Sequence, residues 1–149
     1  KTKSYILIDD CYNASPVSMK SSVDILQLAQ GRKVAILGDM FELGPEERQM
    51  HYDVGQYIHN HNVDVLVTIG TLSEDLIRGL GFYKMDAELP IQKDSGNSLM
   101  CNGVECYSFS SNDRFKECSE KILKEGDSIL LKASNSMRFS ELAQFLKDK

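Results

Sequence analysis

Short apolar runs recur along the chain at intervals that suit a sheet of buried strands. Each run is rich in β-branched or aliphatic residues and is bounded by glycine or polar residues, which is typical of strands covered on both faces. The runs span Tyr5 to Ile8, Val34 to Leu37, Val63 to Ile69, Val104 to Phe109 and Ile129 to Leu131.

Between these runs, apolar residues fall at helical spacing. The predicted helices cover 19–26, 50–58, 73–80, 115–122 and 139–146. Ser15 before Pro16 is typical of a helix start, and Pro45 followed by two glutamates marks another.

The alternation of strands and helices predicts an α/β fold. We expect three layers around a doubly wound, mostly parallel sheet of about five to six strands with right-handed crossovers. The stretch 82–103 fits neither pattern and is long for a plain connection. It leaves three alternatives: a hairpin, an antiparallel edge strand or a mobile loop.

Composition indicates one domain. The 149 residues are 42% hydrophobic and 26% charged, which suits a single compact unit over 1–149. A net charge of −5 with scattered lysines and arginines disfavours nucleic acid and anionic membranes as partners. Because no membrane-length apolar stretch or signal peptide occurs, we expect a cytoplasmic protein. Because the chain starts at Lys1, we expect a piece of a longer one.

The four cysteines suggest neither zinc nor disulfides. Their spacing matches no paired zinc motif, and a domain of this size needs no disulfide framework. We expect reduced thiols that mostly pack in the interior at Cys11, Cys101, Cys106 and Cys118.

Polar clusters follow four of the predicted strands. The carboxyl ends of parallel strands meet at one edge of a sheet, where open α/β sheets bind their ligands. The first cluster is DDCYNASPVSM, from Asp9 to Met19, in which Ser15 and Pro16 open a helix. The free N–H groups of such a helix start suit a phosphate or a ribose. A well-made turn without a ligand is the alternative.

The second cluster is the loop GDMFELG, Gly38 to Gly44. Its glycines either let the backbone approach a ligand closely or simply make the turn. Asp39 stays open between ligand binding and capping, and a local structural role is favoured for Glu42. The third cluster, after the strand that ends at Ile69, indicates little beyond an N-cap at Ser73.

The fourth cluster is KASNSMR, Lys132 to Arg138. Lys132 could neutralise a phosphate or carboxylate, and Arg138 offers a planar fork for the same groups. Two alternatives remain: an ion pair from Lys132 to Asp9 or Asp10 that preorganises the site, and a solvent-facing Arg138.

The remaining chemistry is sparse. His51, about one to two turns after the GDMFELG loop, is the histidine nearest a cluster, although lone helical histidines are more often hydrogen-bonded surface residues. No GxSxG, HExxH, GxGxxG or GxxxxGK[ST] motif occurs. The chain alone therefore lacks the usual cradle for the β- and γ-phosphates of a nucleotide.

Three motifs in order resemble the C-terminal domain of the Mur ligases, above all of the D-alanyl-D-alanine-adding members. They are DDCYNASPVSM, GDMFELG with the later His51 and Gly55, and LLKASNSMR. The family patterns are DDxYNANPxSM, GDMxELG with a later HxxxG, and a KGSR-like turn. The resemblance covers Tyr5 to Leu146, with 82–103 the least matched.

The resemblance implies a three-domain, monomeric enzyme of peptidoglycan precursor synthesis. Its N-terminal domain would hold a UDP-linked muramoyl tripeptide, and its central domain the P-loop and most ligands of Mg²⁺. ATP would convert the tripeptide to an acyl phosphate, which the amine of D-alanyl-D-alanine attacks. This chain would close over ATP, bring the dipeptide and be inactive alone.

The resemblance also divides the candidate residues into two groups. Those on the nucleotide side are Asp10, Tyr12, Asn13, Asp39 and His51. Those on the phosphoryl or dipeptide side are Lys132, Ser134 and Arg138. Asp10 would bond the ribose of ATP, Asn13 and Tyr12 would border the adenine, and the motif assigns no role to Asp39 or His51.

Three positions depart from the family pattern. Ser15 replaces an asparagine and remains a good N-cap. Ala133 replaces a glycine and restricts the backbone, while Asn135 replaces an arginine and removes a cation. The last two changes predict a weaker hold on an anionic substrate, for which Arg138 would compensate.

Other interpretations remain. Asp9 and Asp10 with Lys132 also suit a phospho-receiver domain, but Gly70 stands where a receiver needs its phosphorylated aspartate. The C-terminal domain of another Mur ligase or of folylpolyglutamate synthase is disfavoured by the YNASP and GDMFELG runs. A nucleotide-binding module without chemistry is a further alternative.

Overall fold

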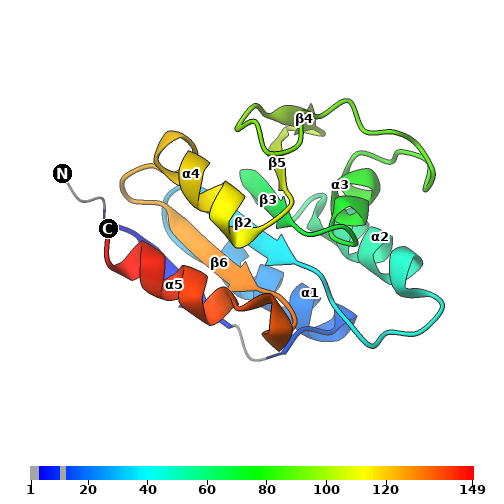
Figure 1. The fold of residues 1–149 in the computed structure, drawn as a ribbon, viewed down its shortest axis with the longest axis horizontal. Coiled ribbons are helices and arrows are strands. Elements are labelled where there is room, and N and C mark those ends of the chain that lie inside the picture. The colour runs from blue at the N-terminus through cyan, green and yellow to red at the C-terminus, as the bar shows by residue number, and fades with distance from the viewer. Residues whose placement is uncertain (1–3, 11–12) are drawn as a thin grey trace.

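A single six-stranded sheet organises the chain, with strand order β1-β6-β2-β3-β5-β4 (Figure 1). The computed structural model describes residues 4–10 and 13–149. Within them the strands are β1 (Ile6–Asp9), β2 (Lys33–Gly38), β3 (Val65–Ile69), β4 (Leu99–Cys101), β5 (Val104–Phe109) and β6 (Ser128–Lys132). Only β4 runs antiparallel to its neighbour in this described part. The predicted fold class is confirmed.

Helices cover both faces of the sheet. They are α1 (Pro16–Gln27), α2 (Glu47–Ile58), α3 (Glu74–Leu80), α4 (Asn112–Ile122) and α5 (Phe139–Lys147), with a 3₁₀ turn η1 (Asn135–Met137). The first three helices bury their apolar stripes on one face, and α4 and α5 on the other. In Figure 1, α4 and α5 lie in front of the sheet and α1 behind it. The central strands β2, β3 and β6 are therefore buried on both faces, as predicted.

The stretch 82–103 supplies the antiparallel edge strand. Asn102 and Gly103 have φ of 49° and 82° and form a two-residue turn that pairs β4 with β5. The residues before β4 are fixed to the helices, because Arg48 donates to the carbonyl of Met85 at 2.5 Å and Arg78 donates to that of Ala87 at 2.8 Å. Of the three alternatives, the hairpin with its extra edge strand describes this region.

Helices α2 and α3 approach closely through two glycines. A Cβ at Gly55 would lie 2.1 Å from the carbonyl oxygen of Leu76, and one at Gly79 would lie 2.0 Å from that of Tyr52. Any side chain at either position would push the helices apart. The glycine of the HxxxG pattern is therefore a packing requirement.

The thiols behave as expected where the structure describes them. Cys101 and Cys106 are buried and free, and Cys118 is partly buried and free, while Cys11 lies outside the described residues. The hydrogen bond with Cys101, together with burial, raises the pKa of the Cys106 thiol above its ordinary value. Cys106 therefore stays protonated in the interior.

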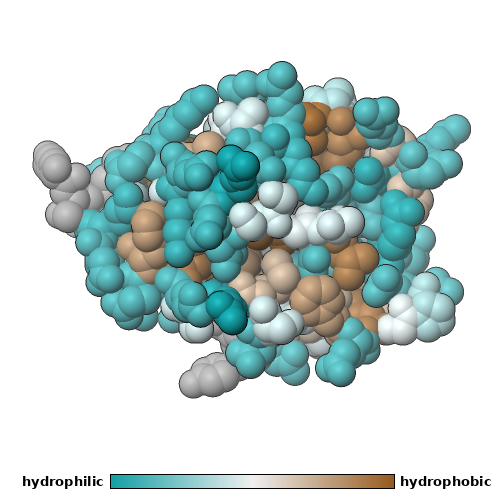
Figure 2. Space-filling view, viewed as in Figure 1, coloured by the Kyte–Doolittle hydropathy of each residue, from teal (hydrophilic) through white to brown (hydrophobic). Residues whose placement is uncertain are grey.

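One face of the molecule is largely polar (Figure 2). In the space-filling view, hydrophilic residues cover most of the visible face, and apolar atoms reach it in limited patches (Figure 2). No helix among the described residues combines the length and apolar character needed to span a bilayer.

Candidate functional site

The four polar clusters converge at the carboxyl edge of the sheet, as the sequence predicts. Strands β1, β6, β2 and β3 are parallel neighbours, and the arrowheads of β2, β3 and β6 in Figure 1 point to the same edge. Two hydrogen bonds join the loop after β2 to the loop after β6. The amide of Ser134 donates to the carbonyl of Asp39 at 3.0 Å, and the amide of Phe41 donates to Ser134 Oγ at 2.8 Å.

Asp10 and Lys132 form an ion pair between β1 and β6. Lys132 Nζ lies 2.7 Å from Asp10 Oδ2 and also donates to the carbonyl of Asn13 at 3.0 Å, while Ser22 Oγ donates to the same carboxylate oxygen at 2.8 Å. The Lys132 side chain is 2% exposed and that of Asp10 is 46% exposed. The ion-pair alternative is therefore the observed one, and the ammonium of Lys132 is occupied within the protein.

The ion pair also sets the charge of Asp10. The hydrogen bond from Lys132 holds the pKa of the Asp10 carboxyl below its ordinary value, with the Ser22 bond adding to the effect and burial opposing it. Asp10 is therefore ionised at neutral pH, with one carboxylate edge toward Lys132 and the side chain half exposed.

The start of α1 is built as predicted. Ser15 Oγ accepts from the amide of Ser18 at 3.1 Å, and Ser18 Oγ accepts from the amide of Ser15 at 2.9 Å, which makes a capping box. Asn13 Oδ1 accepts from the amide of Ala14 at 2.9 Å, and its amide nitrogen has no hydrogen-bond partner among the described residues. The candidate Tyr12 lies outside the described residues.

Asp39 is buried and used internally. Its Oδ1 accepts from the amide of Ser73 at 2.7 Å, at the start of α3. The carboxylate lies against Gly70, whose φ is +115° and whose place no larger residue could take, because a Cβ there would be 2.5 Å from Asp39 Oδ1. Asp39 thus caps α3, and Ser73 Oγ, predicted to do so, instead donates to the carbonyl of Gly70.

His51 is a buried support of the GDMFELG loop. Its Nε2 accepts from the amide of Met40 at 3.0 Å, and its Nδ1 lies 2.7 Å from the carbonyl of Glu47, to which it donates in the matching tautomer. The side chain is fully buried. The surface alternative for His51 is therefore wrong, because both ring nitrogens hold the loop from inside, and a contact with a ligand stays a prediction.

Arg138 is not brought to the other candidates. Its side chain is 75% exposed and lies 3.9 Å from Glu141. It lines a separate pocket of about 290 Å³ beside the start of α4, with Ser111 and Lys116 among its other walls. The solvent-facing alternative therefore describes Arg138, and its compensation for Asn135 stays a prediction.

A hollow at the carboxyl edge lies between the first, second and fourth loops. It has a volume of about 470 Å³ and is lined by Asn13, Phe41, Glu42, Ser134, Asn135 and Ser136. Sequence reasoning gave Phe41 no role and Glu42 a structural one. The sequence signal that could have pointed to these two residues is an aromatic side chain next to an acid in a loop bracketed by glycines.

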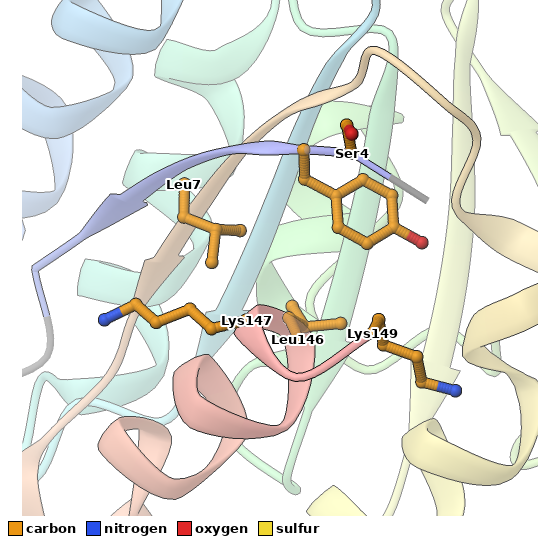
Figure 3. A pocket seen from close by; sticks show the side chains of 6 residues that line it. Ser4, Leu7, Leu146, Lys147 and Lys149 are labelled. Atoms are coloured by element: carbon orange, nitrogen blue, oxygen red, sulfur yellow. The ribbon is translucent and has the colours of Figure 1, made fainter. Parts of the chain in front are cut away.

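Another pocket lies away from this hollow. It has a volume of about 310 Å³ and runs along the edge strand β1 beside the end of α5. Figure 3 shows Lys147 and Lys149 extending away from each other at its rim. It contains none of the candidate residues.

The described residues offer no evident metal centre. Within 4–10 and 13–149, no three side chains of histidine, cysteine, aspartate or glutamate are grouped to hold an ion. The half-exposed side chain of Asp10 and the amide nitrogen of Asn13, which lacks a partner within these ranges, suit the hydroxyls and ring nitrogens of a nucleoside instead.

Comparisons with known proteins identify relatives of this chain. A ligase from Bacillus subtilis named UDP-N-acetylmuramoyl-tripeptide--D-alanyl-D-alanine ligase is 32% identical over 142 residues, which cover 94% of this chain and 27% of that protein. A ligase of the same name from Mycobacterium tuberculosis H37Rv is 29% identical over 148 residues, which cover 94% of this chain and 28% of that protein. The chain thus spans little more than a quarter of these relatives.

Solved structures show the same fold. A crystal structure of MurF from Acinetobacter baumannii aligns with a TM-score of 0.75 at 23% identity, covering all of this chain and 29% of that one. MurF from Thermotoga maritima in complex with ADP aligns with a TM-score of 0.70 at 20% identity, covering 99% of this chain and 29% of that one. The family model described as "Mur ligase, glutamate ligase domain" matches residues 1–135. The chain therefore belongs to the Mur ligase family, as its C-terminal domain.

Proposed function

We propose that this chain is the nucleotide- and acceptor-binding domain of an ATP-dependent ligase that adds D-alanyl-D-alanine to UDP-N-acetylmuramoyl-tripeptide. The observation that carries the proposal is the meeting of the three motif loops around one hollow at the carboxyl edge of the sheet. Ligases named for that reaction match the chain along 94% of its length.

The nucleoside of ATP would lie against Asp10 and Asn13. A half-exposed, ionised carboxylate is a good acceptor for ribose hydroxyls, and the Asn13 amide can donate to an adenine nitrogen. Lys132 acts on this end through Asp10, because it fixes the carboxylate and the Asn13 carbonyl. In this proposal Lys132 is a positioning residue, which is the alternative of an ion pair that preorganises the site.

The remaining parts of the reaction would lie on the rest of the enzyme. The described residues contain no phosphate cradle, so we place the P-loop, the Mg²⁺ ligands and the UDP-linked tripeptide on the N-terminal and central domains. Bound magnesium would supply charge stabilisation for the transferring phosphoryl group. The full enzyme would be a cytoplasmic monomer that works by closing this domain over ATP.

The receiver alternative lacks support. A receiver-like strand order places the first strand inside the sheet, whereas β1 is at the edge here. Asp10 is bound to Lys132, and Gly70 packs against a buried Asp39. No exposed carboxylate follows β3 for phosphorylation within the described residues.

The test is product formation by the full-length enzyme. The enzyme is incubated with ATP, Mg²⁺ and UDP-N-acetylmuramoyl-tripeptide, and in parallel with D-alanyl-D-alanine, D-alanine, D-glutamate or L-lysine, and products are identified by mass spectrometry. We expect an adduct with the dipeptide alone. An adduct with a single amino acid and none with the dipeptide would assign the chain to another Mur ligase, and no adduct at all would refute the ligase proposal.

A further inference from the structure

The GDMFELG loop is fixed by contacts on three sides. Asp39 holds the start of α3, the amide of Met40 binds buried His51, and the amide of Phe41 binds Ser134. Met40 is fully buried and directs the loop inward at that point. The next two side chains, Phe41 and Glu42, are left exposed at the rim of the hollow.

Glu42 occupies a costly backbone conformation without an internal contact that explains it. Its φ is 63°, in the left-handed region that favours glycine, asparagine or aspartate. Its carboxylate makes no hydrogen bond or ion pair with any described residue. Strain that the surrounding loop imposes at the rim of a pocket is typical of a functional side chain.

The single charged residue in the described lining of the hollow indicates which reactant the hollow would bind. Apart from Glu42, its described lining is uncharged, made of amides, hydroxyls and the ring of Phe41, which is 39% exposed. The nearby ammonium of Lys132 is buried against Asp10. An unneutralised carboxylate repels phosphates and attracts an ammonium group, and an aromatic face favours the same cation and apolar methyls.

We propose that Glu42 binds the α-ammonium of the incoming dipeptide and that Phe41 packs against its methyl groups. This inference rests on the proposed function and deepens it, because it makes the hollow the acceptor end of the site. Asp10 and Asn13 then mark the nucleoside end. Glu42 acts by binding and orienting the acceptor, and no bond is made or broken at its carboxylate.

The first test uses Glu42→Gln in the full-length enzyme, with Glu46→Gln as the matched control. Glu46 is an exposed acid four residues on that lies outside the hollow. We expect Glu42→Gln to raise the KM for D-alanyl-D-alanine about tenfold, since a charged contact is lost, and to leave the KM values for ATP and the UDP-linked tripeptide unchanged. Equal dipeptide KM values for the two variants, or a change confined to ATP, would overturn the inference.

A second variant separates binding from folding. Glu42→Gly removes the carboxylate and relieves the backbone at a φ of 63°, so it should fold at least as well as the wild type. We expect the same rise in dipeptide KM. As a probe without an ammonium, D-lactoyl-D-alanine should inhibit wild type and both Glu42 variants equally. Weaker inhibition of the variants by this probe would show that the carboxylate does not act on the ammonium.

The contact of Phe41 with methyl groups is tested by changing enzyme and acceptor together. Phe41→Ala should reduce kcat/KM for D-alanyl-D-alanine more than for glycylglycine, because only the first acceptor has methyl groups to lose. Equal reductions for both acceptors would refute this contact. If the wild-type enzyme shows no dipeptide-dependent turnover, the proposed function fails; if it turns over and the variants match it, only this inference fails.

Discussion

The Asp10–Lys132 ion pair is unequally exposed, and this asymmetry governs what each residue contributes. Lys132 is almost fully buried, whereas water reaches about half of the Asp10 side chain. Loss of Asp10 leaves an ammonium in the interior with the Asn13 carbonyl as its remaining partner. Loss of Lys132 leaves a carboxylate that water can solvate.

Stability should therefore respond more to Asp10 than to Lys132. We expect Asp10→Ala to lower the free energy of unfolding by about 2–3 kcal/mol, and Lys132→Met to lower it by less than about 1 kcal/mol. Urea unfolding of the 149-residue chain measures both. Equal losses, or a larger loss for Lys132→Met, would contradict the assigned burial.

The same pair predicts a response to acid. The Lys132 hydrogen bond lowers the pKa of Asp10 in the folded state below the unfolded value of about 3.9, so its contribution to stability is present above that pH. It is lost as the pH falls through the folded pKa. Asp10→Asn should therefore show a shallower loss of stability below about pH 4 than the wild type or the exposed control Asp113→Asn. The free energy of unfolding is measured by urea at each pH. If it falls with pH equally steeply in Asp10→Asn and in the wild type, the result would argue against the pair.

At the residue scale, the sequence predicted which side chains carry the chemistry better than it predicted which of them are buried. Acids, amides and a lysine after parallel strands point to a shared edge, and Asp10 and Lys132 do meet there. Nothing in the local pattern shows that His51 turns inward or that Arg138 turns away, because each depends on how a neighbouring loop packs. The left-handed φ of Glu42 is equally invisible in the local pattern, since it is set by anchors elsewhere in the chain.

At the scale of elements, helices α2 and α3 depend on a close backbone approach. Gly55 and Gly79 each face a carbonyl oxygen of the opposite helix. This contact fixes α2, which carries His51 and so the base of the GDMFELG loop. The helix pair thereby supports the loop that we propose as the acceptor end of the site.

Gly55→Ala should be strongly destabilising. Helix propensity alone would favour alanine by about 1 kcal/mol. A Cβ 2.1 Å from the Leu76 carbonyl oxygen forces the helices apart, so we expect a net loss of about 2–3 kcal/mol in thermal or urea unfolding. Gln56→Ala, on the exposed side of the same helix, is the control and should change stability by less than about 0.5 kcal/mol. A Gly55→Ala variant as stable as this control would refute the close approach.

Most elements follow directly from periodicity, and the exceptions have a physical cause. Buried strands rich in β-branched residues such as Val65–Ile69 and helical stripes such as that of α1 are strong signals. The strand β4 has only three residues, too few for a periodic pattern, although Asn102 and Gly103 provide the turn signal. Its pairing with β5 is decided by the hairpin and not by its own sequence.

At the scale of the whole molecule, we propose that the described residues supply one side of a reaction site. The hollow, the Asp10 carboxylate and the Asn13 amide face outward from the carboxyl edge, and the chain spans about a quarter of its ligase relatives. Fold and family were predictable because three motifs and the strand pattern agree. The geometry of closure was not, since it depends on residues beyond this chain.

Phosphate release from ATP tests the central claim most directly. It is measured for the full-length enzyme and for the 149-residue chain alone, with UDP-N-acetylmuramoyl-tripeptide and Mg²⁺, in the presence and absence of D-alanyl-D-alanine. We expect dipeptide-dependent release by the full-length enzyme and none by the chain, because the phosphates and the acceptor must be held by different domains. Release by the chain alone, or a full-length enzyme that does not respond to the dipeptide, would contradict the account.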